Sequence, residues 1–179
     1  MSKKAVFFDR DGTLNRSNIL GNKSHAPTSF QDFELLPESV NVTKALKKSG
    51  FLVFVITNQP TISTGVLSIS ELEKMNTYTA KTLNIDHVYY CPHTETDSCN
   101  CRKPKSGMLI VASKEHNLDL SKSWMVGDTW RDVQAGKAAG CKTILLKRDW
   151  SESEKCEPDY IVKGNLGKVL DIILQRSRI

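Results

Sequence analysis

The sequence predicts an α/β fold with a Rossmann-like parallel sheet that is flanked by helices on both faces. Short apolar runs alternate with helical patterns along most of the 179 residues. The run at 51–56 is continuously apolar, which is typical of a strand covered on both faces. Strands that alternate with helices at this spacing indicate a parallel sheet, and such sheets bind ligands at the carboxyl ends of their strands.

The predicted elements follow one another in a regular order. Strands are expected at 5–8, 51–56, 87–90, 124–126 and 143–146, with an added edge strand at 160–162. Helices are expected at 39–49, 70–83, 107–116, 135–139 and 166–175. A Ser-x-x-Glu capping box from Ser70 to Glu73 predicts the start of the second helix, and Gly140 ends the fourth. Residues 15–38 and 147–159 are the least regular and are expected to be loops.

Length and composition fit one globular domain over residues 1–179. The net charge of +5 is not concentrated in a Lys/Arg run, which disfavours a nucleic-acid partner. No apolar run approaches the roughly 20 residues that span a bilayer, and no signal peptide is recognised. The odd number of cysteines, five, suggests a reducing compartment. We therefore expect a cytoplasmic monomer that has neither membrane nor nucleic-acid partners.

The strongest functional signal follows the first predicted strand. Asp9 and Asp11 stand at positions i and i+2 directly after this strand, and Gly12 then permits a tight turn. Two neighbouring carboxylates repel each other unless they share a hard cation, and Mg²⁺ prefers such oxygen ligands. The pattern also occurs in turns and calcium loops, but the residues after it do not continue the ligand spacing of a calcium loop.

Three further strand ends bear polar groups. In chain order these are Thr57, Asn58 and Gln59 after the second strand, Arg102 and Lys103 beyond the third, and Asp128 and Asp132 after the fourth. Each has an ordinary structural explanation as a helix cap, a solvated loop or a turn. Four polar strand ends in one α/β pattern are not explained by turn chemistry. Hydroxyl, amide and cationic groups can hold a phosphate and neutralise its charge, so we predict one shared site.

The order of these motifs resembles that of the haloacid dehalogenase superfamily over nearly the whole chain. This resemblance implies a phosphatase in which Asp9 attacks phosphorus and becomes phosphorylated, while Asp11 acts as general acid and base. It also implies Mg²⁺ bound by the carboxylates of Asp9 and Asp128 and the backbone carbonyl of Asp11. Asp132 would support the metal from nearby.

The same resemblance assigns the remaining residues of the site. Thr57 and a lysine would hold the phosphoryl oxygens, and Asn58 and Gln59 belong to the same substrate-binding segment. An Asp at position 11 favours a phosphatase over a dehalogenase. The intervals between the motifs are too short for a large mobile domain over the site, so a minimal cap or none is expected.

A second cluster is formed by Cys91, His93, Cys99 and Cys101, in a Cys-x-His…Cys-x-Cys pattern. Thiolates and an imidazole in one short loop favour tetrahedral Zn²⁺, and four protein ligands leave no open position for catalysis. A group of buried cysteines with an exposed histidine is the alternative. We predict a structural zinc loop at 91–101.

The zinc loop runs directly into Arg102-Lys103-Pro104. Together with Asp-Arg-Asp-Gly-Thr and Thr-Asn-Gln, this resembles the branch that contains bacterial D,D-heptose 1,7-bisphosphate phosphatases and histidinol phosphatases. In that branch the lysine of Arg-Lys-Pro contacts the transferred phosphate, which implies Lys103 rather than Lys105. The preceding arginine helps recognise the substrate, which implies Arg102.

The evidence on the substrate is divided. Residues 105–109 resemble the Lys-Pro-Gly-Met of heptose enzymes, with Ser in place of Pro. Residues 60–65, however, lack the arginine that those enzymes have after Thr-Asn-Gln, and the short interval from His93 to Cys99 is nearer the histidinol phosphatase pattern. We expect a small phosphorylated sugar such as D-glycero-D-manno-heptose 1,7-bisphosphate. Histidinol phosphate and an inactive zinc-stabilised binding module are the alternatives.

Overall fold

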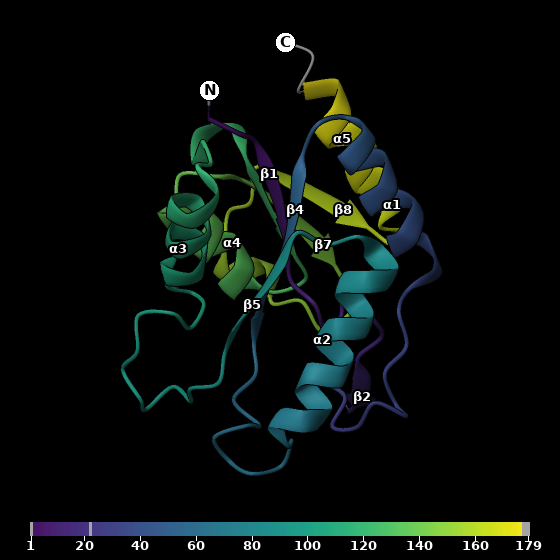
Figure 1. Ribbon diagram of the computed structural model, residues 1–179, viewed down its shortest axis with the longest axis vertical. Coiled ribbons are helices and arrows are strands. Elements are labelled where there is room, and N and C mark those ends of the chain that lie inside the picture. Colours follow the sequence, from purple (N-terminus) through teal and green to yellow (C-terminus); the bar gives the residue numbers. More distant parts are fainter. Residues whose placement is uncertain (1, 22, 177–179) are drawn as a thin grey trace.

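The computed structural model describes residues 2–21 and 23–176. Within these residues a six-stranded parallel sheet runs in the order β5-β4-β1-β6-β7-β8 (Figure 1). Its strands are β1 (Ala5–Phe8), β4 (Leu52–Asn58), β5 (His87–Cys91), β6 (Trp124–Gly127), β7 (Lys142–Lys147) and β8 (Tyr160–Lys163). The predicted parallel sheet is confirmed, including its edge strand.

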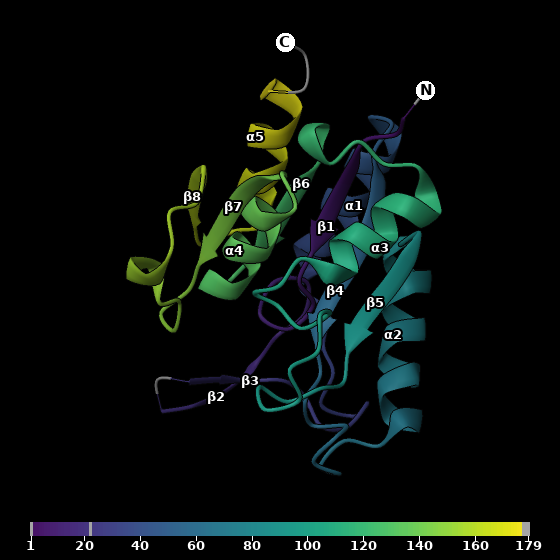
Figure 2. The same ribbon diagram turned by 90° about the vertical axis from the view of Figure 1, so that its left-hand side faces the viewer.

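Helices cover both faces of the sheet, as predicted. They are α1 (Pro37–Lys48), α2 (Ile69–Leu83), α3 (Gly107–His116), α4 (Trp130–Ala138) and α5 (Gly167–Arg176). Helices α1, α2 and α5 pack on one face, and α3 and α4 pack on the other (Figures 1 and 2). No helix within the described residues is long and apolar enough to cross a membrane.

The central strand β1 is completely buried between two hydrophobic cores. Val6 and Phe8 face the core under α1, α2 and α5, whereas Ala5 and Phe7 face the core under α3 and α4. Phe7 stacks on Phe54 of β4 with 5.4 Å between the ring centroids. Burying one such side chain contributes roughly 1.5–3 kcal/mol. This packing fixes β1 from both sides and thereby fixes the position of the residues at its carboxyl end.

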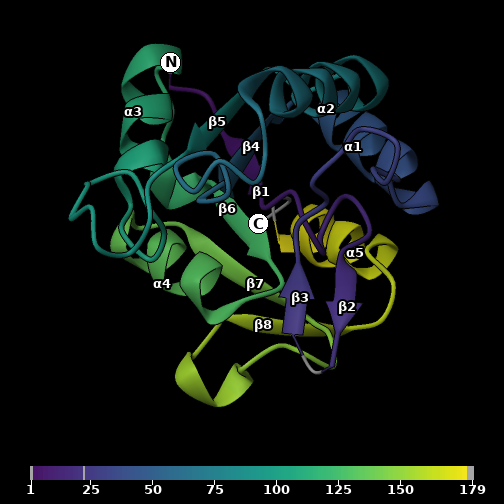
Figure 3. The same ribbon diagram turned by 90° about the horizontal axis from the view of Figure 1, so that it is seen from below.

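The expectation of a loop over residues 15–38 is wrong in part. This segment contains the antiparallel hairpin of β2 (Asn18–Leu20) and β3 (Lys23–His25), which projects beyond the carboxyl end of the main sheet (Figures 2 and 3). All of β2 is exposed, so its sequence has no alternation of buried and solvent-facing residues to reveal it. Residues 147–159 form a loop with one 3₁₀ turn at Ser153–Lys155, close to expectation.

The predicted cap of α2 is also wrong by two residues. The N-cap is Ser68, whose Oγ accepts a hydrogen bond of 3.2 Å from the backbone N–H of Glu71. Two Ser-x-x-Glu patterns overlap here, and packing selects the earlier one. Leu67 and Leu72, on either side of Ser68, are both buried in a small cluster beside the helix start, as in a hydrophobic staple.

Candidate active site

A pocket of about 340 Å³ lies where the carboxyl ends of β1, β4 and β6 meet the loop that follows β5. Seven of the predicted site residues line it: Asp9, Asp11, Thr57, Asn58, Arg102, Lys103 and Asp128. Ser24, His25 and Ala26 at the end of the hairpin form another part of its wall. The pocket thus combines the predicted strand ends with a hairpin that sequence patterns did not reveal.

Three buried carboxylates, from Asp9, Asp128 and Asp132, form the floor of the site. Each contributes an oxygen that lies within 4.8 Å of the other two. Lys103 Nζ donates to Asp9 Oδ1 at 2.7 Å, to Asp132 Oδ1 at 2.6 Å and to the carbonyl of Ile56 at 2.8 Å. Lys103 is only 3% exposed, so its three donors are all directed to protein oxygens.

Burial makes ionisation of these carboxyl groups costly, so nearby positive charge stabilises the cluster. Burial raises the pKa of Asp9 well above its usual value against the opposing effect of Lys103, and raises the pKa of Asp128 to about 6, with the charge of Asp132 adding to both. Burial alone would lower the pKa of Lys103, but Asp132 and Asp9 raise it above its usual value, so this lysine stays charged. One ammonium beside three carboxylates leaves net negative charge, and all-oxygen donors suit a hard divalent cation.

Asp128 is held by neighbours from two other segments. Its Oδ1 accepts from Thr13 Oγ1 at 3.2 Å, and its Oδ2 accepts from Trp150 Nε1 at 2.6 Å. Gly12 lies against the same carboxylate with φ of +86°, and a Cβ there would come within 2.4 Å of Asp128 Oδ2. Gly12 is therefore required for the close approach as well as for the turn. Sequence reasoning missed Trp150, because it lies in an irregular loop far along the chain.

Asp132 is oriented by the start of α4. Its Oδ2 accepts from the backbone N–H of Thr129 at 3.0 Å and from Thr129 Oγ1 at 2.6 Å. This capping arrangement starts α4 at Trp130, five residues before the predicted range. With Lys103 on Oδ1 and Thr129 on Oδ2, Asp132 is engaged by the protein on both oxygens, which fits its predicted supporting role.

The carboxylate of Asp11 is held by its own set of hydrogen bonds. The guanidinium of Arg10, which is fully buried, donates to its two oxygens at 3.2 and 3.1 Å. Asn15 Nδ2 donates at 3.1 Å and Gln59 Nε2 at 2.6 Å. Gln59 also donates to Thr57 Oγ1 and is fully buried, so it supports Asp11 and Thr57 from behind the pocket wall. This position differs from the substrate-contacting place expected for Gln59.

Asn58 fixes the loop that presents Lys103. Its Oδ1 accepts from the backbone N–H of Lys103 at 3.1 Å, and its Nδ2 donates to the carbonyl of the same residue at 3.0 Å. A side-chain amide that satisfies both backbone groups acts as a local substitute for strand pairing. The Thr57-Asn58 pair at the end of β4 therefore supplies a pocket hydroxyl and an anchor for the loop that carries Lys103.

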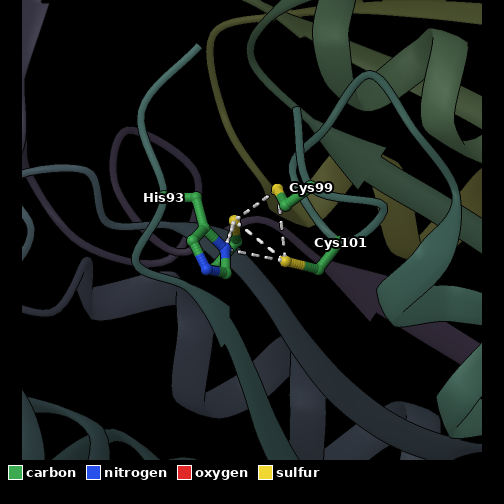
Figure 4. A group of neighbouring side chains, drawn as sticks. His93, Cys99 and Cys101 are labelled. Carbon is green, nitrogen blue, oxygen red and sulfur yellow. Dashed lines mark hydrogen bonds between the residues drawn. The ribbon is translucent and has the colours of Figure 1, made fainter. Parts of the chain in front are cut away.

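The predicted Cys/His cluster is present as a compact group (Figure 4). Cys101 Sγ lies 3.2 Å from Cys91 Sγ, 3.5 Å from Cys99 Sγ and 3.3 Å from His93 Nδ1. Burial raises the pKa of Cys91 to about 12. Burial also opposes ionisation of Cys99, but donors from Arg102, Cys101 and Cys91 lower its pKa to about 6. Four soft donors at these separations can hold a metal ion.

The Cys/His cluster also positions the cations of the site. Arg102 donates from its backbone N–H to Cys99 Sγ at 3.4 Å and from Nη1 to the carbonyl of His93 at 3.0 Å. Lys105 is directed away from the pocket, because its Nζ donates to the carbonyl of Cys99 at 2.5 Å. Between the two lysines, it is Lys103 that reaches the carboxylate floor.

Comparison with known proteins identifies the class to which this fold belongs. Residues 100–166 match the HAD-hydrolase-like family. The structure aligns with D,D-heptose 1,7-bisphosphate phosphatase from B. bronchiseptica, solved with magnesium and phosphate, at a TM-score of 0.81 and 26% identity over 97% of this chain and 99% of the other. A HAD-like phosphatase from Mesorhizobium loti aligns at a TM-score of 0.78 and 28% identity, over 97% and 87%. The fold is that of a HAD-type phosphatase.

Sequence relatives identify the family within the HAD-type phosphatases to which the chain belongs. The chain is 36% identical to a D-glycero-β-D-manno-heptose-1,7-bisphosphate 7-phosphatase from Pasteurella multocida, over 90% of this chain and 92% of the relative. It is 34% identical to the corresponding α-anomer enzyme from Campylobacter jejuni, over 99% of both. The chain belongs to the family of heptose-1,7-bisphosphate 7-phosphatases.

Proposed function

We propose that this chain removes the 7-phosphate of D-glycero-D-manno-heptose 1,7-bisphosphate through a phosphoaspartate on Asp9. The observation that supports this most directly is Lys103, which is buried and donates to both Asp9 and Asp132 at the floor of the pocket. A protonated lysine at the nucleophile provides positive charge where a phosphoryl group is transferred. The choice of sugar follows from the substrate for which the sequence relatives are named.

The reaction divides into two displacements. An oxygen of Asp9 forms a bond to phosphorus while the bond from phosphorus to the sugar oxygen breaks, and Asp11 gives that oxygen a proton. Asp11 then takes a proton from a water molecule that attacks the phosphoaspartate, which releases inorganic phosphate and restores Asp9. Thr57 and Lys103 hold the phosphoryl oxygens through both steps. Arg10, Asn15 and Gln59 orient Asp11 between them.

Magnesium fits the donor set at the floor. The carboxylates of Asp9 and Asp128 and the backbone carbonyl of Asp11 would hold it, with Asp132 and Trp150 fixing the side chains around it. When bound, Mg²⁺ supplies positive charge that stabilises the phosphoryl group in transfer.

Zinc is our proposal for the Cys/His cluster. Zn–S bonds of about 2.3 Å in a tetrahedron place the sulfurs about 3.8 Å apart, and the sulfurs here lie 3.2 to 3.7 Å apart. Four ligands close the site, so the metal would be structural. Its effect on catalysis would pass through Arg102, which contacts both Cys99 and His93.

A comparison of kcat/KM on three substrates tests the proposed function. These are the α and β anomers of the heptose 1,7-bisphosphate and histidinol phosphate. The relatives include enzymes named for each anomer, so the assay also assigns the anomer. A clear preference for histidinol phosphate would overturn the proposed substrate. Absence of activity on all three would favour the inactive binding module. The monomeric state, cytoplasmic location and lack of membrane or nucleic-acid partners stay predictions.

A further inference from the structure

Two arginines form a wall shared by the active-site pocket and an adjoining pocket of about 300 Å³. Arg102 comes from the loop after the Cys/His cluster, and Arg131 comes from the first turn of α4. Both guanidinium groups are directed to the carboxylate of Glu95. Glu95 Oε1 lies 3.1 Å from Arg131 Nη2 and 3.8 Å from Arg102 Nη2. Among the described residues, Glu95 is the ion-pair partner of both.

The family resemblance already assigns Arg102 to substrate recognition. We propose that Arg131 joins it in binding the second anionic group of the substrate, and that Glu95 occupies this position until the substrate arrives. The proposal rests on the proposed function, because it assigns a place to the phosphate that is not hydrolysed. Residues 60–65 lack the arginine that heptose enzymes have after Thr-Asn-Gln. In this chain Arg131 of α4 would supply a cation in its place.

The two arginines are more exposed than the lysine at the floor of the site. Lys103 at the floor is 3% exposed, whereas the side chains of Arg102 and Arg131 are 16% and 33% exposed. Exposure thus increases from the nucleophile towards the two arginines. Glu95 lines the adjoining pocket with them. Arg102, Lys103 and Arg131 line both pockets, so an anion in the place of the Glu95 carboxylate would be held by residues that also border the active-site pocket.

Both arginines are held ready before any ligand binds. Arg102 Nη1 donates to the carbonyl of His93 at 3.0 Å, and the guanidinium of Arg131 lies 4.6 Å from the ring centre of Trp130. Ordering a free arginine side chain costs conformational entropy, so prior ordering of both side chains favours binding. A phosphate can then accept from two planar guanidinium groups, the arrangement for which arginine is best suited.

Glu95 is weakly held and can be displaced. Its side chain is 69% exposed, and ion pairs at such exposed positions contribute little to stability because water screens the charges. Phosphate brings more charge and more acceptor oxygens than a carboxylate, so exchange of Glu95 for phosphate is favourable. The two arginines also exceed the charge of Glu95 by one unit, which attracts a further anion.

The test compares two substrates that differ only in the second phosphate: the heptose 1,7-bisphosphate and the heptose 7-phosphate. Arg131→Gln should lower the ratio of their kcat/KM values by about tenfold, mainly through the KM of the bisphosphate, because charge-assisted contacts are lost. Glu95→Gln should lower that KM about two- to fivefold, because a competing carboxylate is removed. Lys122→Ala removes one exposed charge before β6, at the opposite end of the sheet, and serves as the control.

A calorimetric titration gives a readout without turnover. Asp9→Asn protein should bind the bisphosphate more tightly than the 7-phosphate, and the added Arg131→Gln change should remove most of that difference. Equal binding of the two ligands by Asp9→Asn protein would overturn the inference, as would an unchanged kcat/KM ratio in Arg131→Gln. Failure of the wild-type enzyme to hydrolyse the bisphosphate would instead overturn the proposed function, and the binding experiment would still decide the role of the arginines.

Discussion

Replacing Trp150 by Phe should weaken magnesium binding while leaving the fold intact. The indole Nε1 of Trp150 donates to Asp128 Oδ2 at 2.6 Å, and Phe keeps an aromatic ring but has no donor. Asp128 is only 1% exposed, so water cannot easily replace the lost hydrogen bond. Trp150 itself is half-buried in the loop after β7, where a smaller ring is tolerated.

The expected size follows from the contacts of Asp128. A hydrogen bond to a charged group contributes roughly 1.5–3 kcal/mol, and about 1.4 kcal/mol corresponds to a factor of ten. The same hydrogen bond lowers the pKa of Asp128, so its loss also favours the protonated form, which binds Mg²⁺ poorly. Thr13 still donates to the other oxygen. We therefore expect about a tenfold loss of affinity, at the lower end of the 10–100-fold range for residues that orient metal ligands.

Two measurements test this expectation. The first is the concentration of Mg²⁺ that gives half-maximal turnover, and the second is binding of Mn²⁺ by electron paramagnetic resonance without substrate. Trp130→Phe is a matched control, because its indole donates to the exposed Glu152; its metal affinity should change less than about twofold. Wild-type metal affinity in Trp150→Phe, or an equal loss in Trp130→Phe, would refute the reasoning.

Three further predictions concern the nucleophile, the zinc and the carboxylate floor. Asp9→Asn should lower phosphate release by roughly 10³-fold or more with an unchanged circular dichroism spectrum, because an amide cannot act as the nucleophile; an active variant would exclude the phosphoaspartate. Cys99→Ser should reduce the zinc content from about one ion per chain and lower both Tm and kcat, whereas Cys156→Ser should retain the metal; wild-type zinc content in Cys99→Ser would exclude the assigned ligands. Mg²⁺ should raise Tm more at about pH 7.5 than at about pH 5. Burial raises the pKa of Asp128 to about 6, so below that pH protonation of Asp128 stabilises the metal-free fold and competes with Mg²⁺. Above that pH the carboxylate is ionised and can bind the metal. An equal gain in Tm at both pH values would contradict this role of Asp128.

Local chemistry made much of this protein predictable. Continuous apolar runs such as that of β4 indicate strands buried on both faces, and parallel strands bring their carboxyl ends to one edge. Asp9 and Asp128 follow such strands and Thr57 lies near the end of β4, so their meeting in one pocket could be predicted without knowing any loop. The Cys/His cluster was predictable for a similar reason, since its four residues lie within one short segment.

The tertiary structure decided the contacts that depend on the paths of loops. Trp150 and Asp128 are 22 residues apart, and Arg131 and Glu95 are 36 residues apart. The sequence around each of these residues does not indicate which distant residue it will contact. Exposed loops have no periodic pattern of apolar residues from which their paths could be predicted. The β2–β3 hairpin escaped prediction for the same reason. Sequence periodicity reports which side chains avoid water, and it therefore determines the sheet, its covering helices and the residues at the strand ends. The loops over the site are held by a few polar contacts between distant segments, and these contacts form only when the chain folds.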